Sequence, residues 1–124
     1  MMKFTRENVL AIYKILTDTT GGTVGVRDEG LLLSALEAPY QSFGGEDLFP
    51  TLLEKSVRLG YGLVANHPFV DGNKRIGILV MLSFMELNGI DVTFTDDEVV
   101  DMAMGVASGK YKYEDLLNIV SSKL

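Results

Sequence analysis

The sequence predicts an all-α protein, a compact bundle of about six helices around one central buried helix. Apolar residues recur at intervals of three and four along most of the chain, which is the spacing of one helix face. The segment 73–88 is apolar on nearly every side after a basic start, as expected for an enclosed helix. With 124 residues, 47% of them hydrophobic, the chain suffices for one packed core, so we expect a single domain spanning residues 1–124.

Two helices are predicted in the first third of the chain. Thr5 is a suitable N-cap for the first helix, and the TTGG tract at 19–22 ends it. The apolar stripe of this helix consists of Val9, Ile12, Tyr13 and Leu16. Asp28 is a suitable N-cap for the second helix, which Pro39 ends.

The segment from Pro39 to Pro50, PYQSFGGEDLFP, has no clean period. Its length and its glycines fit a mobile flap over a site, and they fit an ordinary connector as well. Pro50 suits the first turn of the next helix, which runs toward His67. The apolar stripe of that helix consists of Leu53, Val57, Gly60, Tyr61 and Val64.

Caps and terminators delimit the remaining helices. Gly89 is a natural left-handed terminator for the central helix, and 91–94 is expected to be a brief extended connector. The TDDE sequence at 95–98 is a capping box that starts another helix, which Gly109 closes. The inward residues of that helix are Val99, Met102, Ala103 and Val106. A last short helix is marked by Leu116, Leu117 and Val120.

The composition excludes several classes of protein. The net charge is −6 and the 11 Lys and Arg residues are scattered, so we expect no direct nucleic-acid binding. The chain has no cysteine, which removes disulfides and thiolate chemistry and fits a reducing cytoplasm. The N-terminus lacks the apolar core of a signal peptide, and the longest apolar run, 76–82, is too short to cross a bilayer. We therefore expect a soluble, cytoplasmic protein with no membrane partner.

Residues 67–75, HPFVDGNKR, contain the only histidine of the chain and lead directly into the central helix. A loop that ends at a helix N-terminus presents backbone N–H groups, here near Gly72 and Asn73, and glycine lets a phosphate approach the main chain. Arg75 can bind two phosphate oxygens at once, and Lys74 adds a point charge. This arrangement predicts a site for a polyphosphate.

Two further residues of the motif carry chemistry. Asp71 is the candidate ligand for the Mg²⁺ that such a polyphosphate carries. His67 is the candidate general base, because imidazole changes its protonation near neutral pH. The residues alone leave a second interpretation open, in which DGN is an ordinary turn, the histidine is only hydrogen-bonded and the cations are solvated. The sequence contains no GxxxxGK(S/T), GxGxxG, HExxH or GxSxG motif.

The motif resembles the signature of the Fic and Doc superfamily, HPFx(D/E)GN(G/K)R, and every defined position of that signature is met. The segments 25–39, 49–55 and 86–89 resemble those of the Doc, or death-on-curing, branch. The resemblance implies a compact Fic-type helical core, in which Phe69 points inward and fixes the loop. It also implies a role for each site residue: His67 as the base, Asp71 as the Mg²⁺ ligand, Gly72 and Asn73 as the anion hole, and Arg75 on phosphate.

Two positions separate the chain from the protein adenylyltransferases of the family, which usually read GNGRxxR. Lys74 replaces the second glycine, and Ile78 replaces the second arginine. A lysine side chain fills space that glycine would leave to a phosphate, and the missing arginine removes a cation for the far end of the triphosphate. In the Doc branch this pattern goes with a nucleotide bound in the reverse sense. The resemblance therefore implies transfer of the γ-phosphoryl group of ATP to a hydroxyl side chain of a protein.

The resemblance also implies partners. The family's known target is a threonine of translation elongation factor Tu, whose modification arrests protein synthesis, and its usual neutraliser is a small, separate antitoxin. Residues 42–46 have the spacing of the inhibitory (S/T)xxxE(G/N) motif, but Asp47 follows, so we expect no self-inhibition. Two alternatives stay open: AMP transfer to Ser, Thr or Tyr, and a non-catalytic relative that binds a nucleotide or a partner.

Overall fold

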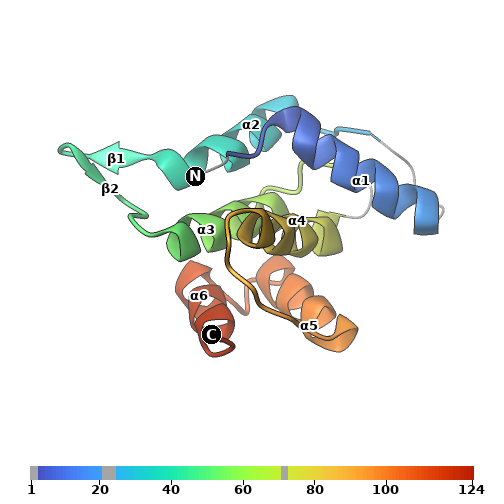
Figure 1. Ribbon diagram of the computed structural model, residues 1–124. Coiled ribbons are helices and arrows are strands. Elements are labelled where there is room, and N and C mark those ends of the chain that lie inside the picture. The colour runs from blue at the N-terminus through green and yellow to red at the C-terminus, as the bar shows by residue number, and fades with distance from the viewer. Residues whose placement is uncertain (1–2, 21–24, 71–72) are drawn as a thin grey trace.

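The computed structural model describes residues 3–20, 25–70 and 73–124, and within these residues it confirms the all-α class (Figure 1). The α-helices are α1 (Arg6–Thr20), α2 (Glu29–Glu37), α3 (Leu52–Ala65), α4 (Asn73–Leu87), α5 (Asp96–Ala107) and α6 (Tyr113–Ser121). A 3-10 turn, η1 (Ala38–Tyr40), and two short strands, β1 (Ser42–Phe43) and β2 (Glu46–Asp47), lie between α2 and α3. No helix of the described residues is both long and apolar enough to cross a membrane.

Most helix ends lie where the sequence predicts them. The Asp28 carboxylate accepts a hydrogen bond from the Leu31 amide at 3.0 Å and caps α2. Gly89 and Gly109 follow α4 and α5 with φ of 92° and 81°, the left-handed conformation that favours glycine. The expectation for Pro50 is wrong: Thr51 is the N-cap of α3, so the proline lies before the helix.

Figure 1 shows three layers, with α3 and α4 in the middle, α1 and α2 on one side, and α5 and α6 on the other. One face of α4, with Ile76, Val80 and Phe84, packs into a core cluster with α1 and α2. The other face, with Ile78, Met81 and Met85, packs against α5 and α6. The helix after the motif is therefore the central buried helix, as predicted.

Glycines allow α3 and α4 to pack closely. A Cβ on Gly77 would lie 2.5 Å from Cγ2 of Val64, and a Cβ on Gly60 would lie 2.8 Å from Cβ of Met81. Glycine weakens a helix by about 1 kcal/mol relative to alanine. Here the missing side chains of these glycines let α3, which ends before the motif, pack directly against α4, which begins after it.

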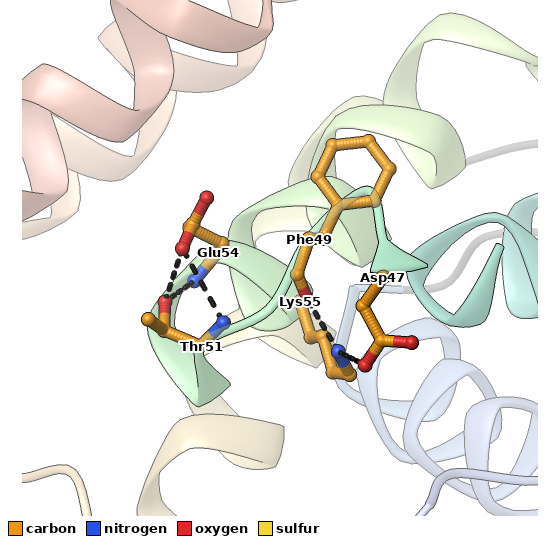
Figure 2. A network of polar contacts seen from close by, with 5 residues as sticks. All are labelled: Asp47, Phe49, Thr51, Glu54 and Lys55. Atoms are coloured by element: carbon orange, nitrogen blue, oxygen red, sulfur yellow. Dashed lines mark hydrogen bonds and ion pairs between the residues drawn. The ribbon is translucent and has the colours of Figure 1, made fainter. Parts of the chain in front are cut away.

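The segment after α2 forms a hairpin tied to the first turns of α3 (Figure 2). The ammonium of Lys55, a residue only 6% exposed, donates to the Asp47 carboxylate at 3.2 Å and to the Phe49 carbonyl. The Thr51 and Glu54 side chains cap the same helix end reciprocally. Because α3 has 14 residues, about 20 Å of helix, it separates the hairpin base from His67. This placement fits a connector and does not support a flap over the motif.

Candidate functional site

The motif begins with a break in α3. Asn66 is the C-cap of α3, and His67 follows it with φ of 53°. A left-handed residue that is not glycine is uncommon and costs about 1–2 kcal/mol. Pro68 disfavours the right-handed helical conformation for the residue before it, so the helix cannot continue through the histidine. The His67 side chain is exposed, as a group that meets a substrate must be.

A short antiparallel contact with residues 25–28 holds this loop. Val26 and Phe69 form an isolated β-bridge, and the Val70 amide donates to the Gly25 carbonyl at 3.0 Å. The Pro68 carbonyl accepts hydrogen bonds from the amides of residues 27 and 28, at 2.6 and 3.1 Å. The loop after α3 is thus joined to the segment that begins α2, some distance away in sequence.

The structure adds Arg27, which the sequence analysis did not single out. Its guanidinium donates from Nε, at 2.8 Å, and from Nη2 to the main-chain carbonyl of His67. Nη2 also lies 3.5 Å from the carbonyl oxygen of Asn66. The signal available in the sequence was an arginine next to the helix cap Asp28, within a segment already similar to the Doc branch.

Phe69 anchors the loop in the core, as expected. The side chain is 0% exposed and belongs to the core cluster of α1, α2 and α4. Its ring centroid lies 4.4 Å from that of Tyr13 on α1. Burial of a phenylalanine in this position fixes the loop to the core while Val70, the next residue, is 53% exposed.

The basic residues of the motif lie in the first turn of α4. Lys74 and Arg75 are both exposed, and neither forms an ion pair with a described residue. Cations at the positive end of a helix dipole are unfavourable, so these residues do not serve the helix. An anion bound there would compensate them.

Position 78, one turn further along α4, is buried. Ile78 is 0% exposed and packs in the cluster shared with α5 and α6. The described part of α4 therefore offers an apolar side chain at the position where the adenylyltransferase signature has its second arginine.

Part of the predicted site lies outside the described residues. Asp71, the predicted Mg²⁺ ligand, and Gly72, half of the predicted anion hole, are not among them, and the side chain of Asn73 is also outside. Within residues 3–20, 25–70 and 73–124, no group of three or more His, Asp or Glu side chains is placed to hold a metal ion. The contacts of residues 25–28 with the loop form a clamp on the motif. His67 lies just after α3 and the two cations lie in the first turn of α4, so the clamp and these three residues belong to the adjoining ends of the two helices.

A second arginine contacts the start of α2. Arg6 of α1 donates from Nε to the Glu29 carboxylate at 2.9 Å, and from Nη2 to its other oxygen. This hydrogen bonding raises the pKa of Arg6 and lowers the pKa of the Glu29 carboxyl. The two side chains are 38% and 51% exposed. The pair links α1 to α2 and does not contact the described residues of the motif loop.

Comparison with known proteins agrees with this geometry. The sequence matches a model of the Fic/DOC family over residues 3–85, and the chain therefore belongs to that family. Two relatives place it in the Doc branch. It is 36% identical over 118 residues to "Toxin Doc" of Mycolicibacterium smegmatis, covering 95% of this chain and 79% of the relative. It is 27% identical over 110 residues to "Protein kinase doc" of Escherichia phage P1, covering 89% of this chain and 86% of the relative.

Proposed function

We propose that this protein is a Doc-type toxin that transfers the γ-phosphoryl group of ATP to a Ser or Thr hydroxyl of a protein target. One observation carries the choice of reaction: Lys74 is exposed in the first turn of α4, whereas Ile78 is buried against α5 and α6. The chain thus lacks the second cation of the adenylyltransferase signature and has an additional one beside Arg75. The relative named "Protein kinase doc" supports the same choice.

In the proposed mechanism, His67 accepts the proton of the attacking hydroxyl. A bond forms between that oxygen and the γ-phosphorus, the bond from the γ-phosphorus to its bridging oxygen breaks, and ADP leaves. Arg75 and Lys74 hold phosphate oxygens as negative charge shifts toward the leaving group. The exposed location of His67, Lys74 and Arg75 supports these assignments.

Mg²⁺ is the proposed cofactor. Two exposed cations at a helix N-terminus fit a polyphosphate, and a carboxylate together with phosphate oxygens is the donor set that Mg²⁺ prefers. We assign the carboxylate to Asp71 and the anion hole to the backbone of Gly72 and Asn73. When bound, the metal neutralises phosphate charge.

The proposed target is a threonine of elongation factor Tu, so that the transfer blocks translation in the cytoplasm. The toxin name of the Mycolicibacterium relative supports this kind of role. We further propose that a separate antitoxin protein restrains the activity. The hairpin that contains residues 42–46 supports external restraint, because its base lies at the end of α3 opposite to His67.

The test supplies ATP labelled at either the γ or the α phosphate, together with purified elongation factor Tu or a bacterial lysate. We expect the γ label alone to appear on protein. His67→Ala should reduce the transfer by about 10²–10⁴-fold. Thermal unfolding of this variant, measured in parallel, shows whether the loss comes from the missing base or from an unfolded protein.

Other outcomes identify the alternatives. Transfer of the α label alone would replace the kinase by an AMP transferase. Absence of either label, with no Mg²⁺-dependent nucleotide binding in calorimetry, would indicate a non-catalytic relative. Full activity of His67→Ala would contradict the assignment of the base.

A further inference from the structure

The main chain at His67 is fixed by contacts from a segment 40 residues away. Its carbonyl accepts from both Nε and Nη2 of Arg27. The same arginine is held at its own backbone, where its amide donates to the Pro68 carbonyl. Arg27 therefore binds the peptide units on both sides of the Cα of Pro68, directly after the left-handed residue.

The contact between Arg27 and the His67 carbonyl is favourable for physical reasons other than packing. The last carbonyls of a helix carry partial negative charge, and a cation there is favourable. A left-handed histidine is held in place only where its surroundings determine the conformation. A planar guanidinium that directs two donors at one carbonyl resists rotation of that peptide more than a single ammonium donor would.

We propose that Arg27 is a positioning residue for the transfer reaction, and that it holds the backbone of His67 in the conformation from which the imidazole acts as base. The effect on catalysis rests on the proposed function, whereas the effect on the histidine itself does not. Arg27 acts through the His67 carbonyl and does not bind the nucleotide.

Arg6 provides a matched control. It is also an arginine with two side-chain hydrogen bonds near the start of α2, and its side chain is 38% exposed. Its bonds go to the Glu29 carboxylate, and it makes no hydrogen bond or ion pair with the described residues 67–70. Arg6→Met removes the same charge and the same number of side-chain bonds to its partner residue. It therefore measures the loss of an arginine that contacts the start of α2, without disturbing the loop.

The first measurement is an NMR spectrum of the imidazole, in which the proton on Cε1 gives one signal because the chain has a single histidine. In Arg27→Met we expect this signal to shift and broaden or divide, as the His67 backbone exchanges between conformations. In Arg6→Met it should coincide with that of the wild type. This measurement needs no ATP and no target, so it decides the positioning even if the chain is not a kinase.

The second measurement is the kinetics of phosphoryl transfer. Displacement of a catalytic group by about 1 Å can cost 10²-fold in rate, so we expect Arg27→Met to lower kcat by about tenfold to a hundredfold. The KM for ATP should stay unchanged. Arg27→Lys, which retains one donor, should lose less kcat than Arg27→Met and should show a smaller shift of the signal.

Three outcomes would overturn the proposal. One is a histidine signal in Arg27→Met that matches the wild type. Another is a raised KM for ATP with unchanged kcat, which would make Arg27 a nucleotide ligand. The third outcome applies if Arg27→Met does not fold, in which case Arg27→Lys is used instead. A wild-type kcat together with a wild-type histidine signal in Arg27→Lys would then overturn the proposal.

Discussion

The α5–α6 layer and the motif at the start of α4 are built by different rules. On the α5–α6 side, α5 begins with a Thr95 capping box and three acidic residues, which suit the positive end of a helix. In the middle layer, α4, the helix that follows the motif, has no acidic residue in its first turn and has Lys74 and Arg75 there instead. His67, at the start of the motif, adds a left-handed backbone that glycine would adopt more easily.

The difference shows where the chain serves stability and where it serves a ligand. Local preferences and tertiary packing agree in the α5–α6 layer, and they conflict at the motif. Conflicts of this kind concentrate at functional sites, where other contacts offset their cost. Here the offsetting contacts are the buried Phe69 and the hydrogen bonds from residues 25–28.

Truncation of one core residue on each face of α4 tests whether stability and catalysis depend on different parts of the molecule. These two variants have the largest expected effects. Phe69 and Leu116 are both 0% exposed. Phe69→Ala should lower the free energy of unfolding by about 3–5 kcal/mol and Leu116→Ala by about 2–5 kcal/mol, because each leaves a cavity. Urea unfolding measures both losses.

The two variants should differ in catalysis. At a temperature where both remain folded, Phe69→Ala should also lower kcat for γ-label transfer, because Phe69 fixes the motif loop to Tyr13. Leu116→Ala should keep the wild-type kcat, since it packs on the other face of α4. An equal loss of kcat in both variants would mean that the layers are not functionally separate.

Removing one charge from the N-terminus of α4 and one from that of α5 compares the two helix starts directly. Arg75→Met should lower kcat by about 10²–10³-fold, the usual cost of losing a donor to the transition state. It should also stabilise the fold by about 0.3–1 kcal/mol, because it removes a cation from the positive end of α4. The kinetics of γ-label transfer and thermal unfolding give the two quantities.

Asp97→Asn is the matched change in the first turn of α5. It should destabilise the fold by about 0.3–1 kcal/mol, because it removes an anion from a helix N-terminus, and it should leave kcat unaffected. The opposite signs of the two stability changes are the decisive result. A loss of stability in Arg75→Met would show that the cation stabilises α4 rather than binding phosphate.

The sequence predicted the α5–α6 layer almost completely, because its signals are local. The box at 95–98, the terminator Gly109 and the apolar stripes all lie within a few residues of the elements they define. The buried position of Phe69 was also predictable, since Phe69 belongs to a contiguous signature. The roles of the other motif residues stay predictions.

The clamp on the motif was not predictable in the same way. The bridge between Val26 and Phe69 joins segments that only the tertiary fold brings together, and single-residue pairing leaves no alternation in the sequence. The two-residue strands of the hairpin are likewise too short to show a period. Arg27 acts on a backbone carbonyl, so no complementary side chain marked its role.

The pH dependence of stability tests the contribution of Glu98 to the N-terminal cap of α5, and it has the smallest expected effect. Lys123 donates to the Glu98 carboxylate at 2.7 Å, and this bond, followed by that from the Thr95 amide, lowers the pKa of Glu98 below its ordinary value of 4.5. Because the folded-state pKa is depressed, the ionised group stabilises the fold above pH 4.5, and this contribution is lost as the pH falls through the lower folded-state value.

Glu98→Gln removes the titrating group but keeps a side chain that can accept from the Thr95 amide. Its melting temperature should therefore lie below that of the wild type at neutral pH, and the gap should close as the pH falls below 4.5. Lys123→Met should show a weaker pH dependence than the wild type, because it removes the first cause of the lowered pKa. A gap between Glu98→Gln and the wild type that stays constant with pH would show that charge at Glu98 does not contribute to the cap. In that case the acidic first turn of α5 would differ from the basic first turn of α4 in sequence but not in its effect on stability.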